Sequence, residues 1–435
     1  MKLTSQRKIL AISIACSVFL SACGGGEDLQ NETAAQTEAA TTLASVERES
    51  AASLSSASLS SNSTEDTSAR FGPDDFAGDE LPILDPLTFV TEQARESGPI
   101  SSALMAGTVT KWNPGHYIQF GSNANDFVID AALKETAGMP FVKGIMIRAS
   151  WWQLEKGKGN YDFSRIDRYL AKAKAKNKRL FVMIGTKTFD GDKAVPDYLR
   201  TPQYSGGAFR IGTIKGTYGE NMALHDDDVR NRLIALMQAL GKRYNKDNNF
   251  EGVAFNETAW GKMVKPLSST QQKQFFSNFA KVDTATRAAF PNSVVIQFMN
   301  YPANFMPALF ENMKDKGVGM GGPDVFINDP ALERGAYTFN PKAKGVIPIG
   351  MKVESDCYNA VRHGGPYTKV DVRKIYSFAR DRLHSNYIFW NRYTAKHNPW
   401  QDVLKMFKGE AFPNGGAGGL NAACPSKFAS CAPRL

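Results

Sequence analysis

Several features are scarce or missing in this 435-residue sequence, and each absence excludes a class of protein. The five cysteines contain no pair with the spacing of metal ligands and the five histidines are scattered, so we expect no metal site and no cofactor. The apolar stretch that precedes Leu20 is too short for a comfortable membrane span. No Arg-rich stripe interleaves with aromatic residues, so nucleic acid is a weak option and we expect no such partner.

The first 22 residues (1–22) have the three parts of a secretory signal peptide. A head with three basic residues is followed by an apolar stretch and then by Leu20-Ser21-Ala22-Cys23. These four residues before glycines resemble a bacterial lipobox, which implies cleavage before Cys23 and a lipid such as palmitate on its sulfur. Because Gly24 is not Asp, the resemblance also implies a lipid-anchored protein of the outer membrane, on its periplasmic or cell-surface face. The alternative is an ordinary signal peptide with a chance cysteine.

Residues 23–80 are rich in Ser, Ala, Thr and Glu and have almost no aromatic residues. Such a segment cannot bury enough apolar surface to order itself, so we expect a flexible tether. It holds twelve acidic and two basic residues, a charge of −10; the chain carries +9, of which the signal contributes +3, so residues 81–435 carry about +16. A region that basic indicates an acidic partner such as an anionic glycan or lipopolysaccharide. The alternatives are solubility or attraction to the acidic tether.

Three cysteines remain after the signal and the expected lipid site. In the oxidising compartment of an exported protein, Cys424 and Cys431 could close a small loop in the Gly-rich tail, residues 411–435. Cys357 would then be unpaired, and we interpret it as a buried thiol.

Strand-like and helix-like segments alternate through the rest of the chain, which is typical of parallel βα units. Eight strands close a (β/α)8 TIM barrel, an α/β fold, which we place at residues 81–410. The alternative, an open doubly wound sheet, is weakened because no Gly-rich phosphate-binding turn follows the first strand. We predict the strands at residues 116–120, 142–150, 179–185, 250–255, 293–299, 324–328, 346–354 and 386–393.

Active-site residues of such a barrel lie at the carboxyl ends of its strands. Polar or aromatic residues end four of the predicted strands: Arg148 the second, Asn256-Glu257 the fourth, Glu354 the seventh and Trp390 the eighth. We therefore interpret this set as the candidate active site.

This set resembles the clan-A (β/α)8 retaining glycoside hydrolases, which include cellulases, mannanases and β-galactosidases. The second unit carries the resemblance most closely, with an Arg that ends a strand, a Trp, an acidic residue, a Gly-Xaa-Tyr-Asp-Phe turn and a long helix, in "RASWWQLEKGKGNYDFSRIDRYLAKAKAKNKRLFVMIG". The resemblance spans about residues 112 to 405. It implies that Glu257 is the acid/base and Glu354 the nucleophile. One departure is the sixth unit, which ends in Asn328-Asp329 where the clan has an aromatic residue or a His.

Retaining hydrolysis explains why two glutamates are needed. One carboxylic acid protonates the leaving oxygen while a second carboxylate, roughly 5–5.5 Å away, attacks the anomeric carbon. We expect Glu257 to have a raised pKa and Glu354 to be kept ionised by Arg148. Asn256 would bond a sugar hydroxyl, and Trp390 would form an apolar floor for the ring.

Each of these residues also has a structural interpretation. Glu257 could be a helix-start Glu near the helix dipole, Glu354 a surface Glu beside Lys352, and Arg148 part of a structural ion pair. Trp390 could belong to the core. Asp356 competes with Glu354 as the nucleophile.

Four more residues are candidates for substrate contact. Trp151 and Trp152 could line a sugar groove or belong to the core. His116 at the first strand end and Asp190 after the third strand are weaker candidates for binding substrate.

The favoured function is a surface-anchored retaining glycoside hydrolase, a monomer that acts on a polysaccharide or oligosaccharide, with an anionic glycan preferred because of the basic body. The first alternative is a lipoprotein with the same barrel that binds glycan without turnover. The second is a lipoprotein that serves assembly or export of a polymer. A polysaccharide lyase would need a His or Tyr base, and the glutamate pair argues against it.

Overall fold

The computed structural model describes residues 107–435 except 122–123, 190, 213–217, 361–366 and 396. The predicted signal peptide, the tether and the lipid site at Cys23 therefore lie outside the described residues, and so does Asp190. Within the described part of the chain, no helix is both long and apolar enough to cross a membrane.

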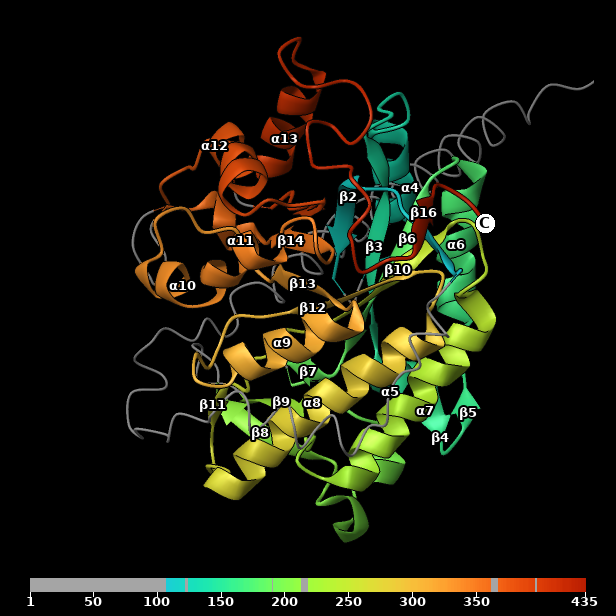
Figure 1. Cartoon of the computed structure of the whole chain (residues 1–435), viewed down its shortest axis with the longest axis vertical. Helices are drawn as coiled ribbons and strands as arrows, with labels where there is room; N and C mark the ends of the chain where they lie inside the picture. Colours follow the sequence, from blue (N-terminus) through green and yellow to red (C-terminus); the bar gives the residue numbers. More distant parts are fainter. Residues whose placement is uncertain (1–106, 122–123, 190, 213–217, 361–366, 396) are drawn as a thin grey trace, which may run out of the picture. The chain divides into compact units, whose positions relative to one another are not determined.

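Eight parallel strands close into one barrel (Figure 1). Each strand is followed by at least one helix before the next barrel strand begins, which confirms the predicted (β/α)8 fold. In chain order, with the first strand pairing with the last, the barrel strands are β2 Gly115–Phe120, β3 Val142–Ser150, β6 Arg179–Gly185, β10 Phe250–Phe255, β12 Val294–Phe298, β13 Gly319–Gly322, β14 Ile349–Val353 and β15 Tyr387–Asn391.

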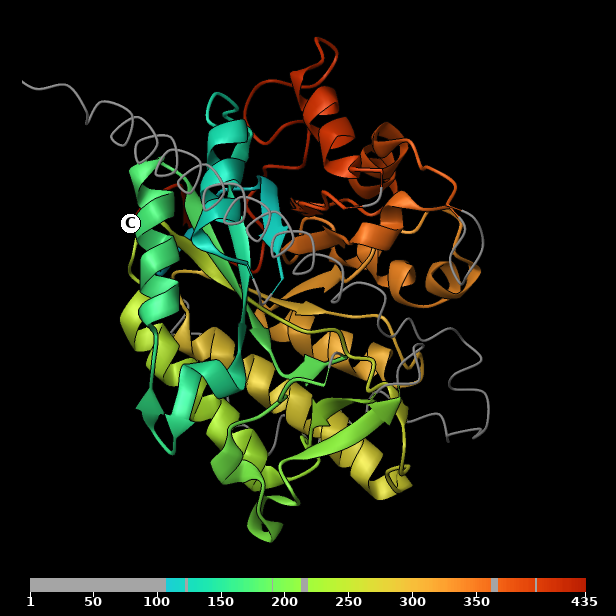
Figure 2. The ribbon, with the colours of Figure 1, turned by 180° about the vertical axis from the view of Figure 1, so that it is seen from behind.

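The helices lie outside the strands, as the two opposite views agree (Figures 1 and 2). Local sequence explains their starts: Asp226 caps α7 (Asp227–Tyr244), and Ser268 with Gln271 forms a capping box on α8 (Ser269–Ala289). The main helices are α4 Asp126–Glu135, α6 Ser164–Ala175, α7 Asp227–Tyr244, α8 Ser269–Ala289, α9 Met306–Lys316, α10 Pro330–Arg334, α11 Asn340–Ala343, α12 Val372–Ser377 and α13 Pro399–Lys408; the shorter turns are α5 Trp151–Leu154, η2 Asp197–Leu199, η3 Pro202–Tyr204, η4 Ala336–Phe339, η5 Ser355–Tyr358 and η6 Phe378–Arg382.

The sixth barrel strand corrects the sequence prediction. It is the Gly-Met-Gly-Gly segment β13, and residues 324–328 follow it without strand structure. The glycines are required, because a Cβ on Gly321 would lie 2.0 Å from the Gly350 carbonyl oxygen. Strand propensity favours the nearby Val-Phe-Ile instead, which is why the pattern misleads. The expectation that Asn328-Asp329 ends this strand was therefore wrong.

A small antiparallel sheet is inserted after the third and fourth barrel strands. Its strands pair in the order β11-β8-β9-β7, and it brings Lys187 beside the segment that follows β10. A second short pair joins β4 to β5, and β5 lies in the Gly-Xaa-Tyr-Asp-Phe motif. The bounds are β7 Lys187–Thr188, β8 Ala208–Gly212, β9 Tyr218–Met222, β11 Lys262–Met263, β4 Glu155–Gly157 and β5 Asn160–Tyr161.

Two packed clusters make the core, one inside the barrel and one between the strands and the helices. The interior cluster takes alternate residues of most barrel strands, as the two-residue period of a strand requires. Its strand members are Tyr117, Met146, Phe181, Met183, Ala254, Val294, Ile296, Phe298, Tyr387 and Phe389. These residues show which alternate positions of each strand face the barrel interior, and the alternation can be followed to the carboxyl end of the strand.

The amino-terminal end of the barrel, which we call the base, is closed by the C-terminal tail. Strand β1 (Val109–Lys111) pairs in parallel with β16 (Ser430–Ala432), and Phe428 joins the interior cluster. Cys424 and Cys431 are joined by a disulfide, and Cys357 is buried and belongs to no disulfide among the described residues. The tail is therefore part of the packed structure.

Candidate functional site

Polar side chains occupy the inward-facing positions at the carboxyl ends of the barrel strands. Two residues after an interior residue, the side chain faces the interior again; Gln119 follows Tyr117 in this way, Arg148 follows Met146, and Asn391 follows Phe389. The same two-residue spacing makes Asn256 face the interior after Ala254, and Lys187 after Met183 and Gly185. It also makes Lys352 and Glu354 face the interior after Gly350. The carboxyl end of the barrel therefore carries a group of charged and amide side chains.

Glu354 directly follows strand β14 and is held from three sides. Lys352 forms an ion pair with one carboxylate oxygen. Gln119 and Asn391, on neighbouring strands, donate hydrogen bonds of 2.7 and 2.9 Å to the other oxygen. The side chain is 15% exposed, so a ligand can still reach it. Charge-assisted bonds of this kind fix the carboxylate in one orientation.

Glu257 follows strand β10 across the barrel mouth from Glu354, with two strands between β10 and β14 in one direction and four in the other. Its carboxylate lies 2.5 Å from the Lys187 Nζ, and its side chain is 14% exposed. Burial alone would raise the pKa of Glu257, but Lys187 and the more distant Lys352 outweigh it and hold the pKa below its usual value. The expectation of a raised pKa was therefore wrong.

Three cations surround the two carboxylates. Burial lowers the pKa of Lys187 despite the attraction of Glu257, and the charges of Arg148 and Lys352 lower it further. Burial also acts to lower the pKa of Lys352, but Glu354 and then Glu257 outweigh it and raise that pKa. Lys352 therefore interacts with both glutamates and couples the two halves of the site.

Arg148 ends up beside the lysines. Its Nη2 donates to the carbonyl of Lys187 at 2.5 Å, and its guanidinium lies against Gly185, where a Cβ would be 3.2 Å from Nε. Lys352 forms an ion pair with Glu354, and the sequence interpretation had named Arg148 as the cation that keeps Glu354 ionised. Arg148 supports the site through the backbone that carries Lys187.

Asn256 is buried, and of its two amide atoms only the oxygen forms a hydrogen bond with a described residue. Its Oδ1 accepts a hydrogen bond of 2.9 Å from the Thr186 amide, which fixes the side chain. Its Nδ2 has no partner among the described residues, so it remains a donor for a ligand.

Two predicted contacts, Trp390 and His116, do not lie at the site. Trp390 is fully buried on the outward face of β15, between the strand and the helices, where its Nε1 donates to the His116 Nδ1 at 2.9 Å. His116 is the second residue of β2, so it lies near the base and its Nε2 contacts the Gly418 carbonyl. The apolar floor assigned to Trp390 and the ligand contact assigned to His116 were wrong.

The tryptophans of the second unit differ from each other. Trp151 is fully buried, and its Nε1 donates to Glu155, which also pairs with Arg232, so Trp151 is a core residue and the groove assigned to it was wrong. Trp152 is partly exposed and donates to Asp192 at 3.2 Å. Trp152 therefore keeps a surface that a ligand could contact.

The sequence interpretation missed Lys187, Gln119 and Asn391 as site residues. Lysine and amide side chains usually indicate a solvated surface, so their types gave no signal. The alternation of side chains along a strand could have identified them, because each lies an even number of residues after an aromatic residue or Met that faces the barrel interior.

One group of side chains among the described residues has the geometry to hold a metal. The ligand atoms of Asp324, Asp356 and Cys357 lie within 4.8 Å of one another. The Cys357 Sγ also accepts the amide of Val325 at 3.4 Å, and Cys357 is buried. These contacts give the buried thiol a structural role beside the loop that follows β13.

The chain is similar in fold to several solved glycosidases. No family model matches it, and no curated protein gives a match. The catalytic domain of β-amylase from Paenibacillus polymyxa aligns with 69% of this chain and 100% of its own, at 9% identity and a TM-score of 0.46. β-Galactosidase from Bacillus circulans sp. alkalophilus aligns with 68% of this chain at 10% identity and a TM-score of 0.48, and the chain spans only 56% of it. Endo-glycoceramidase II from Rhodococcus sp. aligns with 66% of this chain and 76% of its own, at 8% identity and a TM-score of 0.40.

Proposed function

We propose that this protein is a retaining glycoside hydrolase with Glu257 as acid/base and Glu354 as nucleophile. The observation that carries the proposal is that two partly exposed glutamates lie within two residues of the ends of the fourth and seventh barrel strands, with Lys352 acting on both. The barrel order puts these strands on opposite sides of the mouth, which is where a glycosidic bond would have to lie.

The proposed reaction has two steps. Glu257, when protonated, gives its proton to the glycosidic oxygen as the Glu354 carboxylate bonds to the anomeric carbon, so the leaving sugar departs as an alcohol and a glycosyl ester forms. Water then attacks the same carbon, Glu257 takes its proton, and the bond to Glu354 breaks. The bonds from Gln119 and Asn391 hold Glu354 in position, and the free Asn256 Nδ2 would donate to a sugar hydroxyl.

The full chain should be screened for reducing-sugar release on neutral and anionic polysaccharides, beside a Glu257→Gln variant. Release by the parent protein that the variant loses would support a hydrolase and identify its substrate class. Binding of a glycan without release at any pH would instead favour the second candidate below.

A second prediction concerns the pH profile. Replacing Lys187 by Met removes the cation that lowers the pKa of Glu257, and burial would then raise that pKa. Because the acid must be protonated at the start, the alkaline limb of kcat/KM should move up by roughly 1–3 pH units. The measurement is kcat/KM against pH, with Lys193→Met, whose exposed lysine pairs with Asp197, as the control. An alkaline limb that stays in place would show that Glu257 does not set it.

The substrate we favour is an anionic glycan. Three cations face two carboxylates at the mouth, so the site has a net positive charge. Residues 81–435 carry about +16, which adds a long-range attraction for polyanions.

Salt dependence tests this choice of substrate. Turnover of an anionic polysaccharide at low substrate concentration should fall steeply between about 10 and 150 mM salt, where the Debye length shrinks from about 30 to 8 Å. Turnover of a neutral glycan serves as the matched reaction and should change little. Equal salt curves for the two substrates would remove the anionic preference.

We further propose that a lipid on Cys23 anchors the protein to the outer membrane and that the acidic tether lets the barrel reach polymer outside the cell. Radiolabelled palmitate should be incorporated by the parent protein and not by Cys23→Ser. Incorporation into both proteins would contradict the anchor.

The second candidate function is a glycan-binding lipoprotein with the same barrel and no turnover. The observation that favours it is the ion pair of Glu257 with Lys187, which keeps the expected acid ionised. A carboxylate that stays ionised can accept hydrogen bonds from sugar hydroxyls but cannot donate a proton.

A further inference from the structure

A cavity of about 480 Å³ lies at the base of the barrel, at the opposite end of the strands from the candidate active site. It opens between the starts of β3 and β6, beside the loop of residues 137–140 and the end of the tail. Its volume is in the range of small-molecule sites, which hold about 300–1,000 Å³. A lone inorganic ion would fill only a small part of it.

Five cationic side chains and no acidic one line this cavity. They come from separate parts of the chain, so the cavity is formed only when the barrel is complete. They are Lys143 on β3, Lys176 at the end of α6, Lys178 and Arg179 at the start of β6, and Arg434 in the tail.

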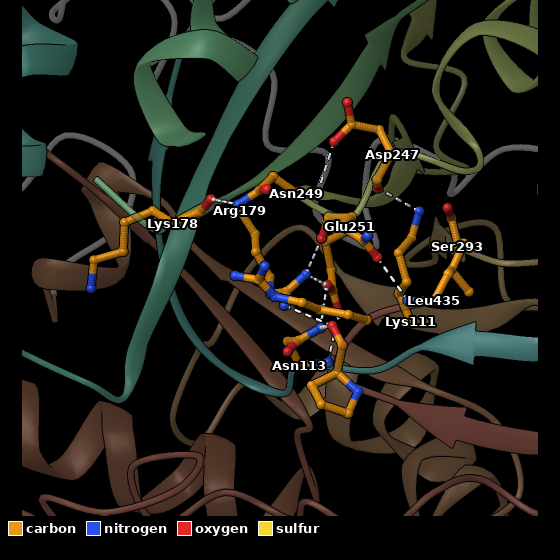
Figure 3. A network of polar contacts seen from close by, with 12 residues as sticks. Lys111, Asn113, Lys178, Arg179, Asp247, Asn249, Glu251, Ser293 and Leu435 are labelled. Atoms are coloured by element: carbon orange, nitrogen blue, oxygen red, sulfur yellow. Dashed lines mark hydrogen bonds and ion pairs between the residues drawn. The ribbon is translucent and has the colours of Figure 1, made fainter. Parts of the chain in front are cut away.

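The nearest buried acid is already in use inside the barrel. Glu251 accepts bonds of 2.7 and 2.8 Å from the backbone and side-chain amides of Asn113, and it lies 3.7 Å from Arg179 (Figure 3). Tyr387 donates a further bond of 2.9 Å. Glu251 is therefore the ion-pair partner of Arg179, and it acts on Lys143 only as a weaker, more distant charge.

The lysines of the cavity form no ion pair with any of the described residues, and the more distant Glu251 acts only on Lys143. Lys178 donates to the carbonyls of Met139 and Val142, which satisfy hydrogen bonds without adding negative charge. Lys143 and Lys176 make no side-chain hydrogen bond or ion pair with any residue that the structure describes. Burial and then Lys143 lower the pKa of Lys178 to about 8. Burial and Arg179 lower the pKa of Lys143 despite the attraction of Glu251.

We propose that this cavity is a binding site for a phosphate monoester of a small organic molecule, such as a sugar phosphate. A phosphate monoester carries about −1.5 to −2 charges and three acceptor oxygens, which suits several separate cations better than a single carboxylate does. The remaining volume would hold the organic part. The cavity shares no residue with the site of Glu257 and Glu354, so this proposal can be tested separately from the hydrolase proposal.

The test measures binding by isothermal titration calorimetry on the full chain, with glucose 6-phosphate, inorganic phosphate and glucuronate as probes. The double variant Lys143→Gln, Lys176→Gln removes the two lysines without partners and should raise the Kd for glucose 6-phosphate about tenfold or more. The matched control is Lys265→Gln, Lys273→Gln, which removes two exposed charges elsewhere and should leave that Kd unchanged. Circular dichroism of both variants checks that they fold.

Each outcome decides the proposal. Tighter binding of glucose 6-phosphate than of inorganic phosphate, lost in the first variant only, supports a phosphate ester site, and equal affinity would assign the site to free phosphate. Equal loss in both double variants would show diffuse attraction to the basic body and would overturn the site. Absence of binding by the parent at low salt, or glucuronate binding as tightly as glucose 6-phosphate, would also overturn it.

Discussion

Replacing Glu354 by Ala is expected to lower kcat on the order of 10⁴- to 10⁶-fold, the largest effect of any single change at the site. Without this carboxylate, no group on that side can bond to the anomeric carbon. Azide should then restore part of the turnover by attacking the open face, and the product should be a glycosyl azide of inverted configuration. The measurement is kcat with and without azide, and the configuration of the product by NMR.

Two further variants show what the loss means. Glu410→Ala removes an exposed glutamate after α13 and should leave kcat unchanged. Asp356→Asn tests the other acidic residue that follows β14. If Asp356→Asn abolishes turnover and Glu354→Ala keeps it, the nucleophile is Asp356 and the assignment of Glu354 is wrong.

Replacing Arg179 by Met should destabilise the protein by about 3–5 kcal/mol, because it leaves the buried charge of Glu251 without its cation. The Glu251 side chain is fully buried, and burial already raises its pKa despite Arg179 and Asn113. The change also removes the hydrogen bonds from Arg179 to the carbonyls of Asn248 and Pro433. Urea unfolding of the full chain measures the free energy of unfolding.

The control for this prediction is a closer ion pair on the surface. Arg243 lies 2.6 Å from Asp167, but the two side chains are 53% and 39% exposed, so Arg243→Met should cost at most about 1 kcal/mol. Adding Glu251→Gln to Arg179→Met should recover part of the loss, because a neutral amide is buried at lower cost than a carboxylate. Equal destabilisation by Arg179→Met and Arg243→Met would contradict the role assigned to burial.

The barrel was predictable where strands carried buried apolar residues. Seven of the eight predicted strands overlap barrel strands, since β3, β6 and β10 are buried runs with few or no exposed residues. The exception, β13, is mostly glycine and is held by close backbone approach, which no propensity scale rewards.

The candidate site was predictable in its position but only partly in its residues. Glu257 and Glu354 follow the strand ends that the sequence indicated. Trp390 was misassigned because adjacent residues of a strand point to opposite faces. Its neighbour Phe389 faces the barrel interior, so Trp390 must face the helices. Lys187 could not be predicted from its residue type, because only the long insertion and its small sheet bury it.

The pairing of β1 with β16 has a consequence for the order of folding. Residues 109–111 find their partners only at 430–432, so most of the chain must be synthesised before the base of the barrel can close. Contacts this far apart in sequence form late and slowly, because a long loop must be ordered first. We therefore expect the strands to assemble before the interior is sealed, and Phe428 and the tail to pack last.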